Sequence, residues 1–304
     1  MIHSEITVII SSVNPERCEE TVKNIAETIG VEHQIVVFDN REHNWGLCKI
    51  YNHCAENANS PYLCFMHEDV LFGTDNWGNI LINFAQTTPK CGIIGFDGSM
   101  QVLKNMYSWG YGESWGNVAH GRIEKNYDNL KLNYKYHHYR NPNNEEFSKV
   151  IGIDGFFQFV KKDILNEIKY DEENFAGFHF YDIDFSFAVS QKYNNYVCFI
   201  VDVFHDSSGN LNAEFVKSMW TFQKKWNKEL SLYINNNKSK LKKIKAELRE
   251  TVIIYDLCKK TSIKKIDYIK HLCIINSTGF MLLSIFYFPL NKIIREINRI
   301  LEKI

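Results

Sequence analysis

The fold is indicated by three short apolar runs near the N-terminus, which read E-I-T-V-I-I-S (Glu5–Ser11), Q-I-V-V-F (Gln34–Phe38) and Y-L-C-F-M (Tyr62–Met66). Each run is nearly continuous, which is typical of a strand that is buried on both faces. Helical patterns lie between them, over Pro15–Ile29 and Trp45–Ala58. Strands that alternate with helices in this way predict an α/β fold built on a mostly parallel sheet.

Beyond the third run, the helix-and-strand pattern continues once and then changes. A helix is expected around Trp77–Gln86 and a strand over Gly92–Phe96. After Asp97, glycine and aromatic residues alternate, as in Trp109–Gly116, which favours hairpins or a long loop. Later patterns predict a strand, a helix, a strand and a helix at Val150–Lys161, Tyr181–Lys192, Tyr196–Val203 and Leu211–Lys228.

A polar break at Asn235–Asn237 divides the chain in composition as well as in pattern. Residues 235–304 carry 15 Lys and Arg against 6 Asp and Glu, whereas the remainder carries 20 against 30. Opposite charge in the two parts predicts that they do different work. We therefore expect a first domain over residues 1–234 and a basic, helical region over residues 235–304. The acidic first part argues against nucleic acid as the main partner.

The basic region contains an uncharged run of 19 residues, Leu272–Leu290, which is flanked by lysine and arginine. Its length approaches that of a bilayer-spanning helix, but polar residues and Pro289 interrupt it. Three alternatives stay open: a helical hairpin packed on the first domain or on a second subunit, a helix on an anionic membrane surface, and a true span. The first two predict a homo-oligomer or peripheral association with the inner face of a membrane.

The eight cysteines are scattered and none forms a C-x-x-C pair, so a zinc site is not expected. Several lie in apolar runs, where cysteine behaves as a small hydrophobic residue. Met1 is followed almost at once by a strand-like run, without the basic segment or cleavage site of a secretory signal. We therefore expect a cytoplasmic protein.

Polar side chains follow each of the three apolar runs: Ser11-Ser12, Asp39-Asn40 and His67-Glu68-Asp69. Ligands bind beyond the carboxyl ends of the strands in parallel α/β sheets, so a site is predicted where these segments meet. Acidic residues there can hold a hard divalent cation, Mg²⁺ or Mn²⁺, that bridges two phosphates of a substrate. The alternative for His67-Glu68-Asp69 is a solvated turn after a strand.

Three later segments carry further candidate residues. Tyr181-Asp182-Ile183-Asp184 opens a predicted helix, where the helix dipole favours an ionised carboxylate. Such a carboxylate suits a general base, although N-capping also explains it. Asp154-Gly155 can bind sugar hydroxyls or simply form a turn. His205-Asp206 offers a metal or phosphate ligand, or else a structural histidine.

In this order and spacing, the segments resemble GT-A-fold glycosyltransferases of the family 2 type. The resemblance covers residues 4–230 and rests on V-I-I-S-S (Val8–Ser12), V-V-F-D-N followed by N-W-G-L-C-K-I-Y-N (Val36–Asn40 and Asn44–Asn52), F-M-H-E-D-V (Phe65–Val70), I-D-G-F-F-Q-F-V-K-K (Ile153–Lys162), F-H-F-Y-D-I-D-F-S-F (Phe178–Phe187) and V-F-H-D-S-S-G (Val203–Gly209). F-M-H-E-D-V occupies the place of that family's DxD motif. His67 stands where the first acid would be, which leaves the set of metal ligands open.

The resemblance implies a GT-A fold and a role in polysaccharide biosynthesis. The implied reaction is a metal-dependent, inverting transfer of a sugar from a nucleoside-diphosphate sugar, with a UDP-sugar favoured, to a hydroxyl of a glycan or lipid-linked glycan. It implies Mn²⁺ or Mg²⁺ on Asp69 and His205, and Asp182 as the catalytic base. The implied donor contacts are Ser11, Val13, Asp39, Asn40, Asn44, His67 and Glu68, and the implied acceptor or sugar contacts are Asp154, Gly155, Tyr181 and Asp184.

Two other functions stay open. One is a non-catalytic relative that binds a nucleotide-sugar or a glycan as an assembly partner, with which His67 in the DxD position is compatible. The other is a nucleotidyltransferase, which usually needs a glycine-rich, basic loop after the first strand to hold a triphosphate. Ser11–Pro15 contains no glycine, lysine or arginine, which disfavours the nucleotidyltransferase.

Overall fold

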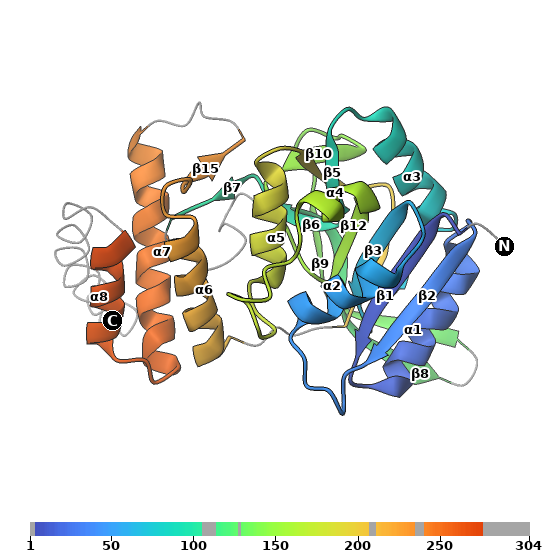
Figure 1. Ribbon diagram of the computed structural model, residues 1–304, viewed down its shortest axis with the longest axis horizontal. Coiled ribbons are helices and arrows are strands. Elements are labelled where there is room, and N and C mark those ends of the chain that lie inside the picture. The colour runs from blue at the N-terminus through green and yellow to red at the C-terminus, as the bar shows by residue number, and fades with distance from the viewer. Residues whose placement is uncertain (1–3, 105–113, 127–128, 207–210, 235–239, 276–304) are drawn as a thin grey trace, which may run out of the picture. The chain divides into compact units, whose positions relative to one another are not determined.

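The computed structural model describes residues 4–104, 114–126, 129–206, 211–234 and 240–275 of the 304-residue chain (Figure 1). The chain forms two compact units. The first comprises Met1–Val102, Trp109–Gly209 and Leu232–Ile234, and the second comprises Leu103–Ser108, Asn210–Ser231 and Asn235–Ile304.

The first unit is built on a seven-stranded sheet. Its strand order is β10 (Phe147–Val150), β13 (Asn194–Cys198), β5 (Cys91–Gly95), β12 (Phe157–Lys161), β3 (Tyr62–His67), β1 (Ile6–Ser12) and β2 (His33–Asp39). β1 pairs in parallel with β2 and β3, and β13 pairs in parallel with β5. β12 is antiparallel to β3 and β5, and β10 to β13. The predicted α/β fold with flanking helices is confirmed, and its sheet is mixed.

Five helices belong to the described residues of the first unit: α1 (Pro15–Thr28), α2 (Leu47–Asn57), α3 (Trp77–Thr87), α4 (Lys162–Glu167) and α5 (Tyr181–Ser190) (Figure 1). The helices and strands predicted up to Phe96 are all present, with ends displaced by one or two residues. α1 begins as its sequence indicates. The Asn14 side chain accepts a hydrogen bond from the Arg17 amide at 3.3 Å, and Pro15 occupies the first helical position.

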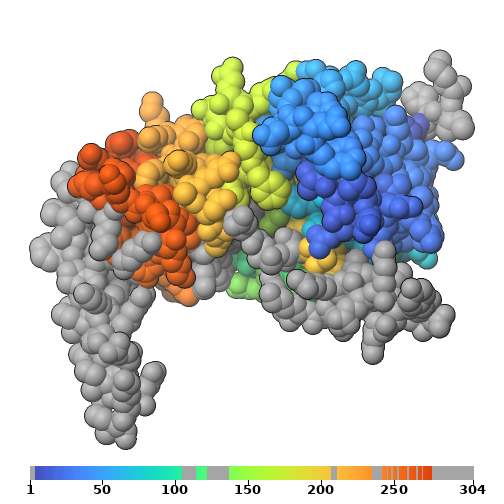
Figure 2. All heavy atoms as spheres, turned by 90° about the horizontal axis from the view of Figure 1, so that it is seen from below, coloured from blue at the N-terminus to red at the C-terminus, as the bar shows by residue number. Residues whose placement is uncertain are grey.

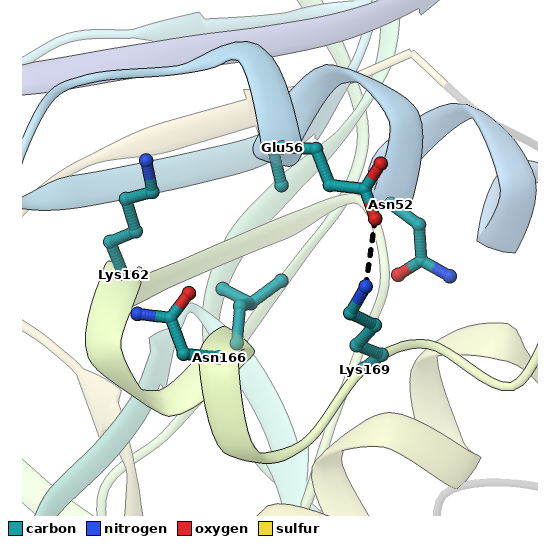
Figure 3. Close-up of a pocket in the computed structure, with 7 residues that line it drawn as sticks. Asn52, Glu56, Lys162, Asn166 and Lys169 are labelled. Carbon is teal, nitrogen blue, oxygen red and sulfur yellow. Dashed lines mark hydrogen bonds and ion pairs between the residues drawn. The ribbon is translucent and has the colours of Figure 1, made fainter.

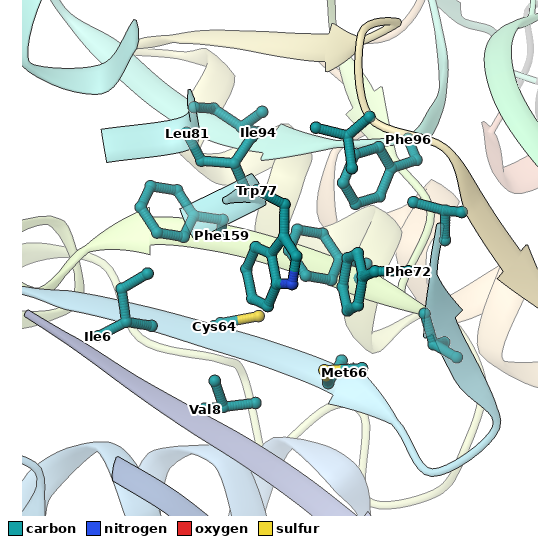
Figure 4. Close-up of a cluster of buried hydrophobic side chains, with 14 of the residues drawn as sticks. Ile6, Val8, Cys64, Met66, Phe72, Trp77, Leu81, Ile94, Phe96 and Phe159 are labelled. Carbon is teal, nitrogen blue, oxygen red and sulfur yellow. The ribbon is translucent and has the colours of Figure 1, made fainter. Parts of the chain in front are cut away.

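The hydrophobic core of the first unit surrounds Trp77, the first residue of α3. The indole is fully buried and stacks on Phe72, with ring centroids 4.2 Å apart. Figure 4 shows it among side chains of the central strands, including Val8 and Cys64. Truncating a buried aromatic residue of this size to alanine costs about 3–5 kcal/mol. The core therefore holds firmly the strands whose ends carry the polar residues.

A second sheet lies in the same unit, in the order β11 (Gly152–Ile153), β6 (Asp97–Ser99), β8 (Ser114–Asn126), β14 (Val203–His205) and β4 (Val70–Phe72), with β9 (Asn129–Arg140) paired to β8. A small third sheet pairs β7 (Gln101–Val102) with β15 (Leu232–Tyr233).

The single strand predicted over Tyr196–Val203 is wrong. The chain forms β13 in the first sheet and β14 in the second, because the backbone between these strands binds the side chain of Asn117 instead of a neighbouring strand. The Asn117 amide donates to the carbonyl oxygens of Phe199 and Val201, each at 3.0 Å. Of the segment Trp109–Gly116, where hairpins or a long loop were expected, residues 109–113 lie outside the described residues, and β8 and β9 after it pair in an antiparallel manner.

The second unit contains three helices among its described residues, α6 (Ala213–Lys225), α7 (Lys240–Lys260) and α8 (Lys265–Ile275). α6 buries Val216, Met219 and Phe222, and the ring of Trp220 on α6 stacks on His271 of α8 at 4.8 Å. Because of these contacts, residues 210–231 group with the C-terminal helices. The unit therefore starts earlier in the chain than the boundary predicted after residue 234.

The uncharged run Leu272–Leu290 enters α8 only as far as Ile275, and its remainder lies outside the described residues. Within the described ranges, the helices are too short or too polar to cross a membrane.

Candidate metal and donor site

The predicted polar segments meet at the carboxyl ends of β1, β2 and β3. In the parallel register, Ser12 lies opposite Asp39 on β2, and Ser11 lies opposite His67 on β3. The second sheet adds residues from a much later part of the sequence. Antiparallel pairing of β14 with β4 places His205 opposite Val70, and the Asp206 amide donates to the Asp69 carbonyl at 3.0 Å. The three strand ends and β14 therefore form one site.

The centre of this site is a cluster of His67, Asp69 and His205, which we name the β3–β14 cluster. One ligand atom from each residue lies within 4.8 Å of the others, and His205 Nε2 is 3.4 Å from Asp69 Oδ1. The ring of His205 stacks on Phe156 with centroids 4.6 Å apart, which fixes its orientation. Tyr181 holds His67 through a 2.8 Å hydrogen bond between its hydroxyl group and Nε2.

The β3–β14 cluster has the properties of a cation site. Asp69 Oδ1 and both ring nitrogens of His205 are buried and have no hydrogen-bond partner among the described residues. Buried polar atoms without a partner are rare, because each costs desolvation free energy that nothing offsets. A divalent cation would give Asp69 Oδ1 and His205 the partner that they lack, and His67 lies close enough to be a third ligand. The residues present therefore fit Mn²⁺ or Mg²⁺.

The protonation states also suit a metal, because ligands must be deprotonated. Burial, together with the nearby ring of His205, lowers the pKa of His67 to about 4. Burial alone would raise the pKa of Asp69, but His205, His67 and Arg17 lower it below its ordinary value. At neutral pH His67 is thus neutral and Asp69 is charged.

Glu68 serves the loop between β1 and α1. Its carboxylate accepts hydrogen bonds from Ser12 Oγ at 2.6 Å and from the amides of Val13 and Asn14 at 3.1 and 2.9 Å. The Glu68 carboxylate, which was predicted to contact the sugar donor, therefore binds the backbone of the β1–α1 loop. Val13 itself is 62% exposed, so the loop presents its side chain to solvent.

The second predicted donor segment is also ordered by local contacts. Asp39 is about half exposed and pairs with Arg41, whose hydrogen bonds lower the pKa of Asp39 to about 2. The Asn40 side chain donates to the Trp45 carbonyl at 2.9 Å and accepts from its amide at 2.8 Å. Asn44 has a left-handed φ of 50° within this loop. Asp39 is thus presented at the surface, whereas Asn40 closes the loop.

A second group of predicted residues lies where β12 meets α5, and we name Asp154, Gly155 and Asp182 the β12–α5 cluster. Asp182 accepts a hydrogen bond from the Gly155 amide at 2.9 Å, and Asp154 accepts one from the Phe156 amide at 3.1 Å. A Cβ atom on Gly155 would lie 2.1 Å from the Tyr181 hydroxyl, so only glycine fits there. Burial and the neighbouring Asp154 raise the pKa of Asp182 to about 7.

The remaining predicted residues divide between the two clusters. Tyr181 links them, because it lies against Gly155 and binds His67. Asp184 is 2% exposed and stands two positions after Asp182 on α5. Residues two apart on a helix point to different faces, so the structure does not bring Asp184 together with Asp182.

Four further charged or titratable residues lie near the β3–β14 cluster, and the predicted site included none of them. Arg17 binds Asp69 and Asp206, with nitrogen-to-oxygen distances of 3.5 and 2.8 Å. His138 pairs with buried Asp97 at 3.1 Å, and the ring of His120 lies 5.6 Å from that of His205. The signal for Asp97 was available, because it follows the strand that the sequence predicts over Gly92–Phe96. No local signal marked the others, since long-range pairing of β8, β9 and β14 positions the histidines.

A separate pocket of about 190 Å³ lies between α2 and α4 (Figure 3). Its charged lining residues are engaged: Lys169 pairs with Glu56 at 2.7 Å, and the Lys162 ammonium donates to the Ala58 carbonyl. None of the predicted site residues lines this pocket. It is therefore distinct from the two clusters.

Several solved structures are similar to this chain, and three of them are matched over most of it. GalNAc-T7 with UDP, GalNAc and Mn²⁺ is 12% identical over 74% of this chain and 48% of its own, with a TM-score of 0.49. The mannosyltransferase PcManGT from Pyrobaculum calidifontis, in complex with GDP-Man and Mn²⁺, is 11% identical over 95% and 81%, with a TM-score of 0.45. S. aureus TarS 1-349 is 10% identical over 89% and 78%, with a TM-score of 0.46. The chain spans about half the length of GalNAc-T7.

No curated protein sequence matches the chain significantly. A family model described as "Glycosyltransferase like family" matches residues 5–244, which is most of the chain. The chain therefore belongs to this glycosyltransferase-like family.

Proposed function

We propose that the protein transfers a sugar from a nucleoside-diphosphate sugar, with a UDP-sugar favoured, to a hydroxyl of a glycan or lipid-linked glycan during polysaccharide biosynthesis. The observation that carries this proposal is the β3–β14 cluster, in which Asp69 Oδ1 and the ring nitrogens of His205 are buried without a hydrogen-bond partner among the described residues, with His67 beside them. Such an edge of an α/β sheet is where nucleotides bind.

His67, Asp69 and His205 would hold the metal ion. Two imidazoles and one carboxylate suit Mn²⁺ better than Mg²⁺, which prefers oxygen ligands. When bound, the ion neutralises charge on the departing nucleoside diphosphate. Ser11, Val13, Asp39 and the loop closed by Asn40 and Asn44 would line the nucleotide position, and Glu68 would keep the β1–α1 loop in place.

Asp182 would be the catalytic base. A pKa of about 7 lets it take a proton near neutral pH, which is the range in which general base catalysis is efficient. The acceptor hydroxyl would give its proton to the Asp182 carboxylate as its oxygen bonds to the anomeric carbon. The bond from that carbon to the diphosphate oxygen breaks on the opposite face, which inverts the anomeric configuration. Asp154 and Tyr181 would lie against the sugar or the acceptor.

The test measures donor hydrolysis and nucleotide binding in the same set of proteins. Purified wild type, Asp182→Asn and Asp69→Ala proteins are screened with nucleoside diphosphates and nucleotide-sugars, with and without Mn²⁺. We expect metal-dependent thermal stabilisation by one nucleotide in wild type and in Asp182→Asn, and donor hydrolysis in wild type alone. Stabilisation without hydrolysis in any protein would favour a non-catalytic binding partner. No stabilisation by any nucleotide would contradict the proposal.

We further propose that residues 235–304 attach the protein to an anionic membrane surface at the cytoplasmic face or join two copies of it. Supporting this, Ile266 and Ile274 on α8 are 53% and 59% exposed. They stand eight positions apart and so share one helix face, with Lys270 between them. Co-sedimentation with phosphatidylglycerol vesicles and light scattering of the free protein distinguish the two roles.

A further inference from the structure

Arg17 occupies an unusual place in the β3–β14 cluster. It lies in the first turn of α1, and its guanidinium group reaches Asp206 Oδ2 at 2.8 Å and Asp69 Oδ2 at 3.5 Å. The other oxygen of Asp69, Oδ1, is the one that faces His205. In Figure 2, blue atoms of the N-terminal region lie beside a small yellow-orange patch from the later part of the chain. Arg17 thus binds the same carboxylate that would bind the metal.

The backbone that presents Arg17 is fixed from several sides. The Thr21 hydroxyl donates to the Glu68 carbonyl at 2.7 Å, and Asn24 exchanges two hydrogen bonds with the backbone of Phe72. The Glu68 carboxylate holds the loop just before the helix. α1 is therefore attached to the β3–β4 turn that carries Asp69. The Arg17 side chain itself is 45% exposed, so its guanidinium group has room to move.

The charges of the three side chains favour this contact. Asp69 and Asp206 are adjacent carboxylates, since the Asp206 amide binds the Asp69 carbonyl. Arg17 supplies the positive charge between them. A divalent cation on Asp69 would compensate the same charge and repel the guanidinium group. Arginine binds phosphate oxygens with two parallel hydrogen bonds, so a diphosphate would offer it a new partner.

We propose that Arg17 neutralises Asp69 until a metal ion binds there. When metal and nucleotide bind together, the Arg17 guanidinium group leaves Asp69 and binds the diphosphate of the donor. This inference rests on the proposed function. Arg17 competes with a metal that arrives alone, whereas a nucleotide that arrives with the metal draws Arg17 away. Metal and nucleotide must therefore bind cooperatively, and the coupling is reciprocal.

The test measures Mn²⁺ affinity without any turnover. Free Mn²⁺ is followed by electron paramagnetic resonance during titration of the full chain, with and without UDP. Four proteins are compared: wild type, Arg17→Gln, Arg17→Lys and Lys23→Gln. Lys23 is an exposed lysine on the same helix and serves as the charge-matched control.

In Arg17→Gln we expect Mn²⁺ alone to bind about three- to tenfold more tightly, and the enhancement of its affinity by UDP to shrink by a similar factor. Lys23→Gln should match wild type. Arg17→Lys keeps the charge but cannot contact two carboxylates in the same fork, so it should fall between wild type and Arg17→Gln. It also serves as the test variant if Arg17→Gln does not fold.

Wild-type Mn²⁺ affinity together with wild-type enhancement by UDP in both Arg17 variants would overturn the inference and leave the proposed function standing. Absence of Mn²⁺ binding by all four proteins, with and without UDP, would instead contradict the metal site and with it both proposals.

Discussion

Asp69 and Asp182 are carboxylates of two clusters that Tyr181 links, and their surroundings shift their pKa values in opposite directions. Asp69 in the β3–β14 cluster lies beside two imidazoles and a guanidinium group, and these lower its pKa against the effect of burial. Asp182 in the β12–α5 cluster is buried beside another carboxylate, Asp154, and its pKa rises to about 7. These opposite shifts suit the roles proposed for the two residues, with Asp69 as a metal ligand and Asp182 as the base.

The contrast teaches that residue type alone does not define a role here. A carboxylate that stays charged at every physiological pH is a good metal ligand, but it is a weak base. A carboxylate that titrates near pH 7 is an effective base, but it gives a metal less negative charge. Tyr181 connects the two environments, since it contacts Gly155 and hydrogen-bonds His67.

The largest expected effect is loss of the base. Asp182→Asn keeps an oxygen that can accept the Gly155 amide but cannot take a proton, so transfer should fall about 10²- to 10⁴-fold. Donor affinity should stay within about twofold, because the β3–β14 cluster is untouched. Initial rates and nucleotide titrations check this against Asp163→Asn, an exposed aspartate on α4. A rate above one tenth of wild type would exclude Asp182 as the base.

The second largest expected effect is on metal-dependent nucleotide binding at Asp69. Asp69→Asn removes the only carboxylate of the β3–β14 cluster, so stabilisation by Mn²⁺ with nucleotide should vanish. At ligand concentrations of 100 times Kd this stabilisation is about 2.7 kcal/mol, measured as a shift in Tm. Asp75→Asn, an exposed aspartate after β4, should keep the full shift. An unchanged shift in Asp69→Asn would place the metal elsewhere.

A smaller effect concerns the pH dependence of the rate. With the Asp182 pKa at about 7, kcat/KM should fall about tenfold per pH unit below that value and level off above it. Asp154→Asn removes a like charge, which lowers the Asp182 pKa and moves the acidic limb downward by about one unit. Rates of wild type and Asp154→Asn from pH 5 to pH 9 measure the acidic limb and the plateau. A limb that does not move would show that burial alone sets the pKa of Asp182.

The smallest effect is on stability. The folded pKa of Asp182 is raised, so the folded protein binds its proton more tightly than the unfolded chain does. Its contribution to stability is therefore full below the unfolded pKa and is lost as pH rises through about 7. Asp182→Asn should unfold at a higher denaturant concentration than wild type at pH 8 and show no gain at pH 4. Equal destabilisation at both pH values would contradict this.

Local sequence pattern was sufficient for the first half of the fold. β1, α1, β2, α2 and β3 were predicted within two residues, because each combines a clear periodicity with clear end signals. Asp39 and Asp69 followed from the rule that sites form at the carboxyl ends of strands. β4 was missed because three residues carry no periodicity, and the β13–β14 break was missed because Asn117, about 80 residues away, causes it.

The sequence by itself determined the α/β fold, the strand ends that carry Asp69, and the candidate base at Asp182, because periodicity, helix signals and motif order are local properties. Only the tertiary structure decided that His205 and Arg17 contact Asp69 and that the Glu68 carboxylate binds the β1–α1 loop. It also decided that Asp154 raises the pKa of Asp182. Those outcomes depend on long-range strand pairing and on burial, and the free energy of a charge depends on what surrounds it in space.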